Sequence, residues 1–416
     1  MAETQRKKSM PRSASKPPRI GLALAGGGPL GAIYEVGALC ALEESIHGLK
    51  LTECHGYIGV SAGGFLAAGL ANGVTPRELC ASFIENTGDV ADVFDPALLV
   101  RPACREFAQR LSLLPRLLAG AGWELAVDKR SLAGVLERLG RILPTGLFSN
   151  EALERQLRHQ FALPNRSNDF RKLKHKLVLV ATELDSGQAT PFGQPGWDHI
   201  PISQAVQASA AMPGLFPPVE IEGRHYVDGA LKKTVHASVL LDEGLDLLIC
   251  LNPLVPYDAT AASQTSAAAQ LIPHINEGGL PLVLSQTLRS LIHSRLELGM
   301  RGYERSHPDT DIILFEPDQR DPEMFLANTF SYSERRHMAE HAYQQTREML
   351  RSNAQCLGEK FARHGLRLDE AVLADPQRVL VSQLPPHARS GRAVMKLDAV
   401  LTELEHLLSS DSPVTA

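Results

Sequence analysis

The feature that most constrains the fold of this chain is a serine flanked by glycines between a strand-like and a helix-like segment. Gly59, Ser61 and Gly63 form a G-x-S-x-G pattern, with an apolar run at 55–60 before it and a small-residue stretch at 62–72 after it. A sharp strand-to-helix turn needs glycine at both flanks, because side chains there would collide with the neighbouring strand and helix. The turn places the serine hydroxyl at the sheet edge and at a helix N-terminus, which favours negative charge. The pattern predicts Ser61 as a nucleophile; a tight connection with an inert serine is the alternative.

Strand-like and helix-like patterns alternate along the rest of the chain. Short β-rich apolar runs predict strands at 19–26, 55–60, 176–184, 246–253 and 311–317. Helical patterns predict helices at 31–45, 62–72, 203–212, 282–302 and 333–351. Such alternation indicates a mostly parallel sheet with helices on both faces. We therefore expect an α/β protein with three αβα layers and a helical C-terminal extension.

The composition shifts along the chain suggest its domain organisation. Residues 1–18 form a basic tail rich in Ser and Pro, for which we expect disorder. Residues 19–351 would form the catalytic α/β domain, and residues 352–416 the helical C-terminal extension. An insertion at 91–126 alternates leucines and Trp123 with arginines. This insertion is either a helical pair packed on the core or an amphipathic lid that contacts lipid.

Charge and cysteine usage narrow the functional class. The net charge is −5, so the chain lacks the global basic field that attracts nucleic acid. The six cysteines have no CxxC spacing and no HExxH occurs, so we expect no metal site and mostly buried, reduced thiols. The sequence also shows no secretory-signal pattern and no apolar run of 18 residues. We expect a cytoplasmic protein, with peripheral membrane contact or secretion without a signal as further possibilities; the sequence predicts no oligomeric state.

A glycine loop between the first strand and the first helix has more than one interpretation. Gly26, Gly28 and Gly31 satisfy G-x-G-x-x-G, the pattern of a dinucleotide site. The acidic residues in the corresponding region, Glu43 and Glu44, fall inside the predicted helix rather than at the end of the second strand. A structural turn is another interpretation.

The same loop is suited to form an oxyanion hole. Successive glycines expose backbone N–H groups, and the helix N-terminus beyond them adds positive potential. Because Pro29 lacks an N–H, the useful donors would be Gly27 and Gly28. A tetrahedral acyl intermediate requires such donors.

The base that would activate Ser61 has two candidate types. A Ser–Asp–His order would require a later histidine, and five stand at suitable places along the chain: His274, His293, His307, His337 and His341. The competing base is Asp228, which ends a strand-like run and precedes Gly229. Asp-Gly after a β run is also a strong hairpin-turn signal.

Four motifs in order make the chain resemble the patatin-like phospholipases. They are AGGGPLGAIYEVGALCALEE, GVSAGG, ASAAMPGLFPPV and YVDGA, within residues 20–253, with weaker similarity to about residue 317. The resemblance implies that Ser61 attacks an ester carbonyl, that Asp228 accepts the proton directly, and that Gly26, Gly27 and Gly28 hold the oxyanion. Gly31, Gly59, Gly63 and Gly229 would support these motifs.

The resemblance also sets an expectation for activity. It implies a serine acyl hydrolase, a phospholipase, lysophospholipase or esterase, that cleaves acyl-ester lipids through an acyl-enzyme without a metal or cofactor. Leu30 departs from the pattern, because many members carry Arg or Lys there, and DGA replaces the commoner DGG. A catalytically weak lipid-binding or regulatory protein on the same scaffold is the alternative, and a nucleotide-binding oxidoreductase is a further one.

Overall fold

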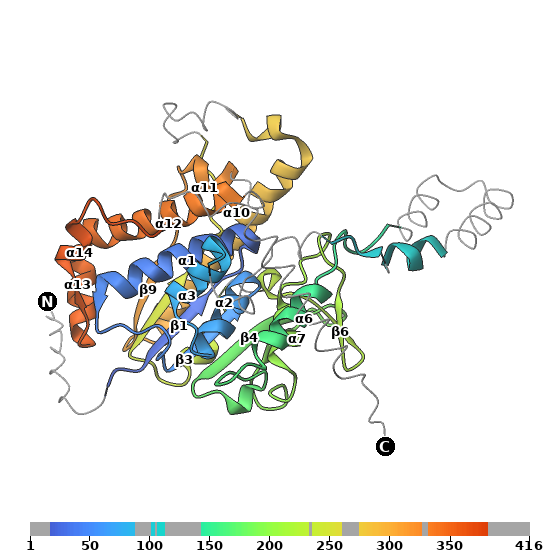
Figure 1. Ribbon diagram of the computed structural model, residues 1–416, viewed down its shortest axis with the longest axis horizontal. Coiled ribbons are helices and arrows are strands. Elements are labelled where there is room, and N and C mark those ends of the chain that lie inside the picture. Colours follow the sequence, from blue (N-terminus) through green and yellow to red (C-terminus); the bar gives the residue numbers. More distant parts are fainter. Residues whose placement is uncertain are drawn as a thin grey trace, which may run out of the picture. The chain divides into compact units, whose positions relative to one another are not determined.

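An eight-stranded sheet forms the centre of the computed structural model, which describes residues 17–87, 101–104, 106–112, 143–232, 235–259, 274–326 and 332–381. The strand order is β6-β7-β4-β3-β1-β8-β9, with β5 paired to β4 (Figure 1). The strands are β1 (Ile20–Leu24), β3 (Gly56–Val60), β4 (Lys176–Glu183), β5 (Ala189–Phe192), β6 (Val219–Ile221), β7 (Arg224–Asp228), β8 (Leu247–Leu251) and β9 (Asp311–Phe315). A separate two-stranded ladder pairs β2 (Ile46–His47) with β10 (Arg367–Leu368).

Helices cover both faces of the sheet, as the sequence predicts. On one face, α8 (Ser238–Leu241) and α10 (Gly279–Ser306) pack on inward side chains of the central strands, with Leu240 and Leu296 in the same buried cluster as Val60 and Val178. On the other face, α2 (Ala62–Ala71) packs on β1, β3 and β4, and α7 (Ile202–Ser209) packs on β4 and β7. Helix α1 (Gly28–Ser45) lies against α2. The three-layer αβα expectation is confirmed.

The remaining helices surround these layers. They are α3 (Pro76–Cys80), η1 (Ala81–Glu85), α6 (Glu151–Gln160), η3 (Phe170–Lys172), η4 (Gly229–Leu231), η5 (Ile275–Gly278), α11 (Pro322–Leu326), α12 (Tyr332–Ser352), α13 (Ala354–Arg363) and α14 (Glu370–Ala374). Helix α3 begins with a capping box, in which the Thr75 hydroxyl accepts from the Glu78 N–H and the Glu78 carboxylate accepts from the Thr75 N–H. Helix α12 packs along α1 (Figure 1).

The sheet is parallel at its centre and antiparallel at one side. The pairs β1–β3, β1–β8, β3–β4 and β8–β9 are parallel. The pairs β4–β5, β4–β7 and β6–β7 are antiparallel, and sequence patterns did not predict β5 or β6. The β6–β7 hairpin turns at Glu222 and Gly223, which both have positive φ. The hairpin signal at Asp228-Gly229 is therefore not a hairpin turn: β7 ends at Asp228 and η4 follows.

Several expectations fall partly or wholly outside the described residues. The tail 1–18 lies outside them apart from residues 17 and 18, and of the insertion 91–126 only 101–104 and 106–112 are described. Helices α13 and α14 fall within the expected C-terminal extension, whereas residues 382–416 lie outside. Four of the six cysteines are buried, and Cys104 and Cys356 are exposed. The domain boundaries stay predictions.

Candidate active site

Strand register brings Ser61 and Asp228 to the same edge of the sheet. Val60, the last residue of β3, pairs with Val180 of β4, so Ser61 follows one step beyond that pair. On the other side of β4, Ala181 pairs with Asp228 at the end of β7. Two strand spacings of about 4.8 Å separate β3 from β7. The chain must therefore cross β4 for the two side chains to meet.

The chain makes this crossing directly after Asp228. A Cβ on Gly229 would lie 2.2 Å from the carbonyl oxygen of Val180 and 3.1 Å from Cγ1 of Val60. Only a glycine allows the backbone to pass so close to Val180 of β4. The carboxylate of Asp228 consequently lies beside Ser61, whose hydroxyl lowers the pKa of the carboxyl group.

Ser61 occupies the strained turn that its motif predicts. Its φ is 55°, a left-handed value uncommon for a residue with a side chain, and it is the N-cap of α2. A Cβ on Gly59 would lie 2.5 Å from the Cα of Gly64, and one on Gly63 would lie 2.5 Å from the carbonyl oxygen of Ala25. Ser61 is 5% exposed. The turn holds its hydroxyl in a nearly dry position at the positive end of a helix.

Asp228 is fully buried and only partly hydrogen-bonded. Its Oδ1 accepts from the Ala230 N–H at 2.9 Å. Its backbone is held by the Ala211 carbonyl, which accepts from its N–H at 3.0 Å, and by the Thr182 hydroxyl, which donates to its carbonyl at 3.2 Å. Its Oδ2 accepts no hydrogen bond of standard geometry from the described residues. Burial raises the pKa of Asp228 to about 6, which the Ser61 and Ala230 contacts offset only in part.

The glycine loop lies against Ser61. A Cβ on Gly26 would lie 3.0 Å from the Cβ of Ser61. Helix α1 begins at Gly28, earlier than the predicted start at Gly31, with Gly27 as its N-cap. Within the described residues, the N–H groups of Gly26, Gly27 and Gly28 donate to no partner. Free N–H groups at the start of an 18-residue helix can stabilise an oxygen anion formed beside Ser61.

Ser209 is a site residue that residue patterns alone did not identify. Its hydroxyl, fully buried at the end of α7, accepts from the Ser61 N–H at 2.8 Å and donates to the Val180 carbonyl at 2.6 Å. It therefore ties the strained turn to β4. The only signal was its place in the ASAAMPGLFPPV motif.

The candidate triad histidines make their contacts elsewhere. His307 contacts Asp242, His337 contacts Glu323 and His341 contacts Asp321, each at 3.2 Å or less. His293 contacts Gln319 at 3.1 Å, and His274 is the N-cap of η5. None of the hydrogen bonds that these imidazoles form in the described part of the chain reaches Ser61.

Glu43 and Glu44, the acidic residues considered for a dinucleotide site, also form their hydrogen bonds elsewhere. Both lie inside α1, where Glu43 accepts from the Leu51 N–H at 2.9 Å. Glu44 accepts from Tyr343 at 2.8 Å and from Arg378 at 2.9 Å. These bonds join α1 to α12 and to the chain that follows it, so the two carboxylates have structural roles.

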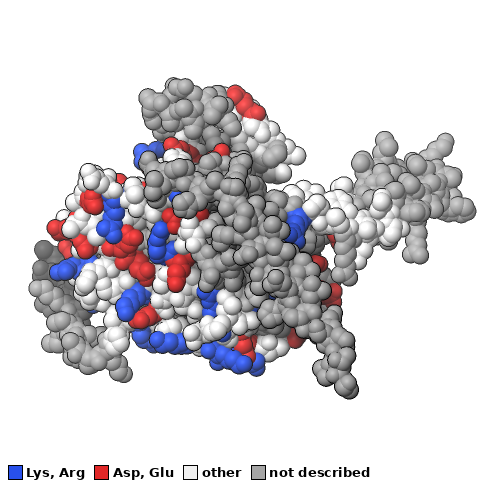
Figure 2. All heavy atoms as spheres, in the orientation of Figure 1, with Lys and Arg blue, Asp and Glu red and all other residues white. Residues whose placement is uncertain are grey.

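The described residues also show how charge, metal-binding side chains and long apolar helices are distributed. On the face drawn in Figure 2, basic and acidic side chains are interspersed over the left and lower part of the described surface. Among the described residues, no three His, Cys, Asp or Glu side chains are grouped to hold a metal ion. No helix in this part of the chain combines the length and hydrophobicity needed to cross a bilayer.

Comparison with models of protein families shows the family to which the chain belongs. The sequence model of the patatin-like phospholipase family matches residues 22–241, a range that includes the glycine loop, the Ser61 turn and Asp228. The chain belongs to the patatin-like phospholipase family. Membership in this family supports lipid-ester hydrolase activity in general.

The solved structures compared below are distant from this chain. VipD from Legionella pneumophila has 17% sequence identity and a TM-score of 0.37, over 82% of this chain and 68% of VipD. The type III effector ExoU has 16% identity and a TM-score of 0.34, over 81% of this chain and 53% of ExoU. The ExoU–SpcU complex from Pseudomonas aeruginosa gives 18% identity and a TM-score of 0.31, over 95% of this chain and 63% of that chain.

Replacement of Ser209 by alanine should lower kcat on a soluble ester by roughly 10- to 100-fold. The buried N–H of Ser61 would lose its acceptor, and small displacements at a reacting centre have effects of this size. The matched control is Ser203→Ala, which removes a buried α7 hydroxyl that bonds to Glu154 at 2.9 Å instead. Equal kcat losses in the two variants would show that Ser209 does not position Ser61.

Replacement of Asp228 by asparagine should stabilise the fold at alkaline pH. The folded-state pKa of about 6 exceeds the ordinary aspartate value of 3.8. The stability that Asp228 contributes below pH 3.8 is therefore lost as the pH rises through about 6. Asparagine keeps an acceptor for Ala230 without the charge. We expect the free energy of unfolding of the variant to exceed that of the wild type by about 1–3 kcal/mol at pH 8. At pH 4 we expect no such difference. Urea unfolding at both pH values measures this difference; a gain independent of pH would contradict it.

Proposed function

We propose that the protein is a serine acyl hydrolase that cleaves carboxylic esters of lipids with a Ser61–Asp228 dyad. The observation that carries this proposal is the fully buried Asp228 carboxylate beside the strained Ser61 turn. A carboxylate with its pKa raised to about 6 is a better proton acceptor than an ordinary aspartate and is still ionised at neutral pH. Residues 19–351 would form the catalytic domain.

Acylation would begin with attack of the Ser61 hydroxyl oxygen on the ester carbonyl carbon. The hydroxyl proton passes to Asp228, for which the unpartnered Oδ2 is the suitable acceptor. The carbonyl oxygen becomes an anion, which the N–H groups of Gly26, Gly27 and Gly28 stabilise. The tetrahedral intermediate collapses when the alcohol leaves with the proton from Asp228. An acyl group then remains on Ser61.

Deacylation would repeat the same steps with water. Asp228 accepts a proton from a water molecule, whose oxygen attacks the acyl carbon. The oxyanion donors act a second time, and Ser61 leaves with the proton. One carboxylate thus serves both half-reactions, because its raised pKa lets it take and return a proton near neutral pH.

Lipid contact near the site is a further part of this proposal. Four exposed apolar side chains lie on segments that are hydrogen-bonded to one another. They are Phe107 (41% exposed), Leu111 (62%), Leu147 (49%) and Leu215 (45%). The Leu147 carbonyl accepts from the Ala103 N–H at 3.1 Å, and the Leu215 carbonyl accepts from the Phe148 N–H at 2.8 Å. Leu215 follows α7, whose last residue Ser209 bonds to Ser61. These side chains would face the lipid as the substrate enters.

A burst assay with a p-nitrophenyl acyl ester tests the dyad. Wild type should release a stoichiometric burst, and kcat/KM should rise with pH through about 6 as Asp228 ionises. Ser61→Ala and Asp228→Asn should each lower kcat by about 10³-fold or more, because nucleophile and base act as a unit. Ser203→Ala is the control. A full burst from Ser61→Ala would overturn the proposal. Wild-type protein that binds lipid vesicles but gives no burst would favour the lipid-binding alternative.

The lipid-contact proposal is tested by comparing two substrates. Phe107→Ser/Leu111→Ser should lower the rate on phospholipid vesicles by about tenfold and leave the rate on the soluble ester nearly unchanged, because only interfacial docking loses apolar area. The matched control is Leu291→Ser/Leu298→Ser on α10, where the leucines are 57% and 63% exposed. Equal losses on vesicles and soluble ester would reject a role of this segment in lipid contact.

A further inference from the structure

Helix α10, which is 28 residues long, has a second apolar face beside the one that packs on the sheet (Figure 1). On its inward face, Ile292, Leu296 and Tyr303 belong to the buried cluster over the central strands. Leu291 directly precedes Ile292, so it points about 100° away around the helix. Its side chain is exposed. Part of the apolar surface of α10 therefore lies outside the core.

The residues of this second face follow the spacing of a coiled coil. Exposed positions recur along α10 at alternating intervals of four and three residues, and we call them the leucine seam: Leu280, Leu284, Thr287, Leu291, Ser294, Leu298 and Arg301. These intervals are those of the a and d positions of a heptad repeat. Each of the four leucines is more than half exposed. A seam of this kind buries its leucines when a second helix packs along it.

We propose that the leucine seam is a dimer interface, in which α10 packs antiparallel to α10 of a second copy of this chain. A two-fold axis between the copies uses the same surface on both, so no other partner is needed. In an antiparallel pair, each a position lies level with a d position of the other helix.

One alignment of the two helices places a leucine in every layer of the seam. Leu280 of each copy then lies level with Leu298 of the other. In the same alignment Leu284 lies level with Ser294, and Leu291 lies level with Thr287. The small hydroxyl side chains leave room for the leucine opposite, so the layers between the ends can pack closely.

Charges at the two ends of the seam favour this antiparallel arrangement. The alignment brings Arg301 of each copy to the end of the other helix where Glu277 lies, two residues before α10. Both side chains are exposed. A parallel pair would instead set Arg301 against Arg301 and Glu277 against Glu277, and like charges at such positions are repulsive. The antiparallel pair also places the two helix dipoles in opposite directions.

The width of the seam favours a helix over a lipid surface as its partner. Thr287 and Ser294 separate the leucines, which therefore form a narrow line along α10. A line of a and d positions suits a coiled-coil partner, whereas a helix that lies on a bilayer presents a broader apolar face. Glu297, directly before Leu298, is also exposed. Its carboxylate would be repelled by anionic lipid.

Sedimentation equilibrium of the full-length chain over a concentration series tests the dimer. The charge variants are Glu277→Arg, Arg301→Glu and the double variant Glu277→Arg/Arg301→Glu. The seam variant is Leu284→Ser/Leu291→Ser. Its matched control is Leu184→Ser/Val379→Ser, which changes two exposed apolar side chains elsewhere. Circular dichroism confirms that each variant is folded.

We expect a reversible dimer in the wild type and in the control. Each single charge variant should weaken the dimer by roughly three- to tenfold, and the double variant should restore it, because the exchanged charges attract again. The seam variant should weaken it by more than about tenfold, because four leucines per dimer are lost. Hydrolysis per chain should not change, because each copy holds its own Ser61 and Asp228.

Three results would overturn the proposal. They are a wild type that stays monomeric at every concentration, a dimer that the seam variant leaves intact, and charge variants whose losses add in the double variant. A monomer that binds phosphatidylcholine vesicles and loses this binding in the seam variant would assign the face to lipid instead. Association is measured without substrate, so the outcome is independent of the proposed hydrolase activity.

Discussion

The pairing of β4 with β3 on one side and with β7 on the other is the constraint on which the candidate site depends. It aligns the end of β3 at Val60 with the end of β7 at Asp228. Strand β3 runs parallel to β4 and ends opposite Val180, whereas β7 runs antiparallel to β4 and ends opposite Ala181, so the two strand ends lie at the same level. The Gly229 backbone then passes close to Val180 of β4, and the Ser209 hydroxyl fixes the turn at Ser61. The proposed nucleophile and the proposed base are therefore held by main-chain geometry.

The burial of Asp228 links function to a cost in stability. A carboxylate with one oxygen bonded to Ala230 and the other without a partner is poorly compensated inside the protein. This poor compensation raises the pKa of the Asp228 carboxyl group. A two-residue mechanism requires such a more basic carboxylate. The strained φ of Ser61 adds to this cost. The three-layer packing on both faces of the sheet supplies the stability that offsets both.

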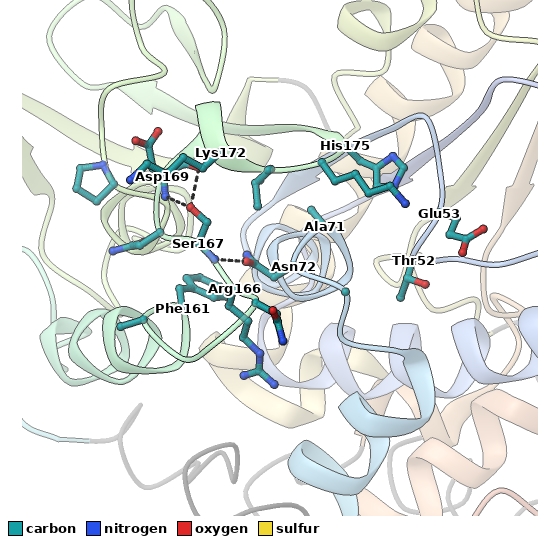
Figure 3. Close-up of a pocket in the computed structure, with 17 residues that line it drawn as sticks. Thr52, Glu53, Ala71, Asn72, Phe161, Arg166, Ser167, Asp169, Lys172 and His175 are labelled. Carbon is teal, nitrogen blue, oxygen red and sulfur yellow. Dashed lines mark hydrogen bonds between the residues drawn. The ribbon is translucent and has the colours of Figure 1, made fainter.

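The sequence predicted the parts of the fold whose signals are local. The buried central strands and the glycine-flanked turn at Ser61 each have a pattern within a few residues. Strands β5 and β6 were missed, because four and three residues are too short for an alternation to be recognised. The role of Ser209 depends on a hydrogen bond that spans 148 positions, and no local pattern encodes such a contact. A groove lined by Asn72, Arg166 and Lys172 (Figure 3) was likewise not predicted, because its walls come from segments far apart in the chain.

We propose that the Ser61 hydroxyl becomes a nucleophile because Asp228 takes its proton. This proton transfer is tested by the rate of covalent labelling by a fluorophosphonate across pH, with the labelled residue identified by mass spectrometry. We expect a single adduct on Ser61, formed at a rate that rises with pH through about 6 and that Asp228→Asn abolishes. An adduct on another residue, or a Ser61 adduct whose rate is unchanged by Asp228→Asn, would contradict it.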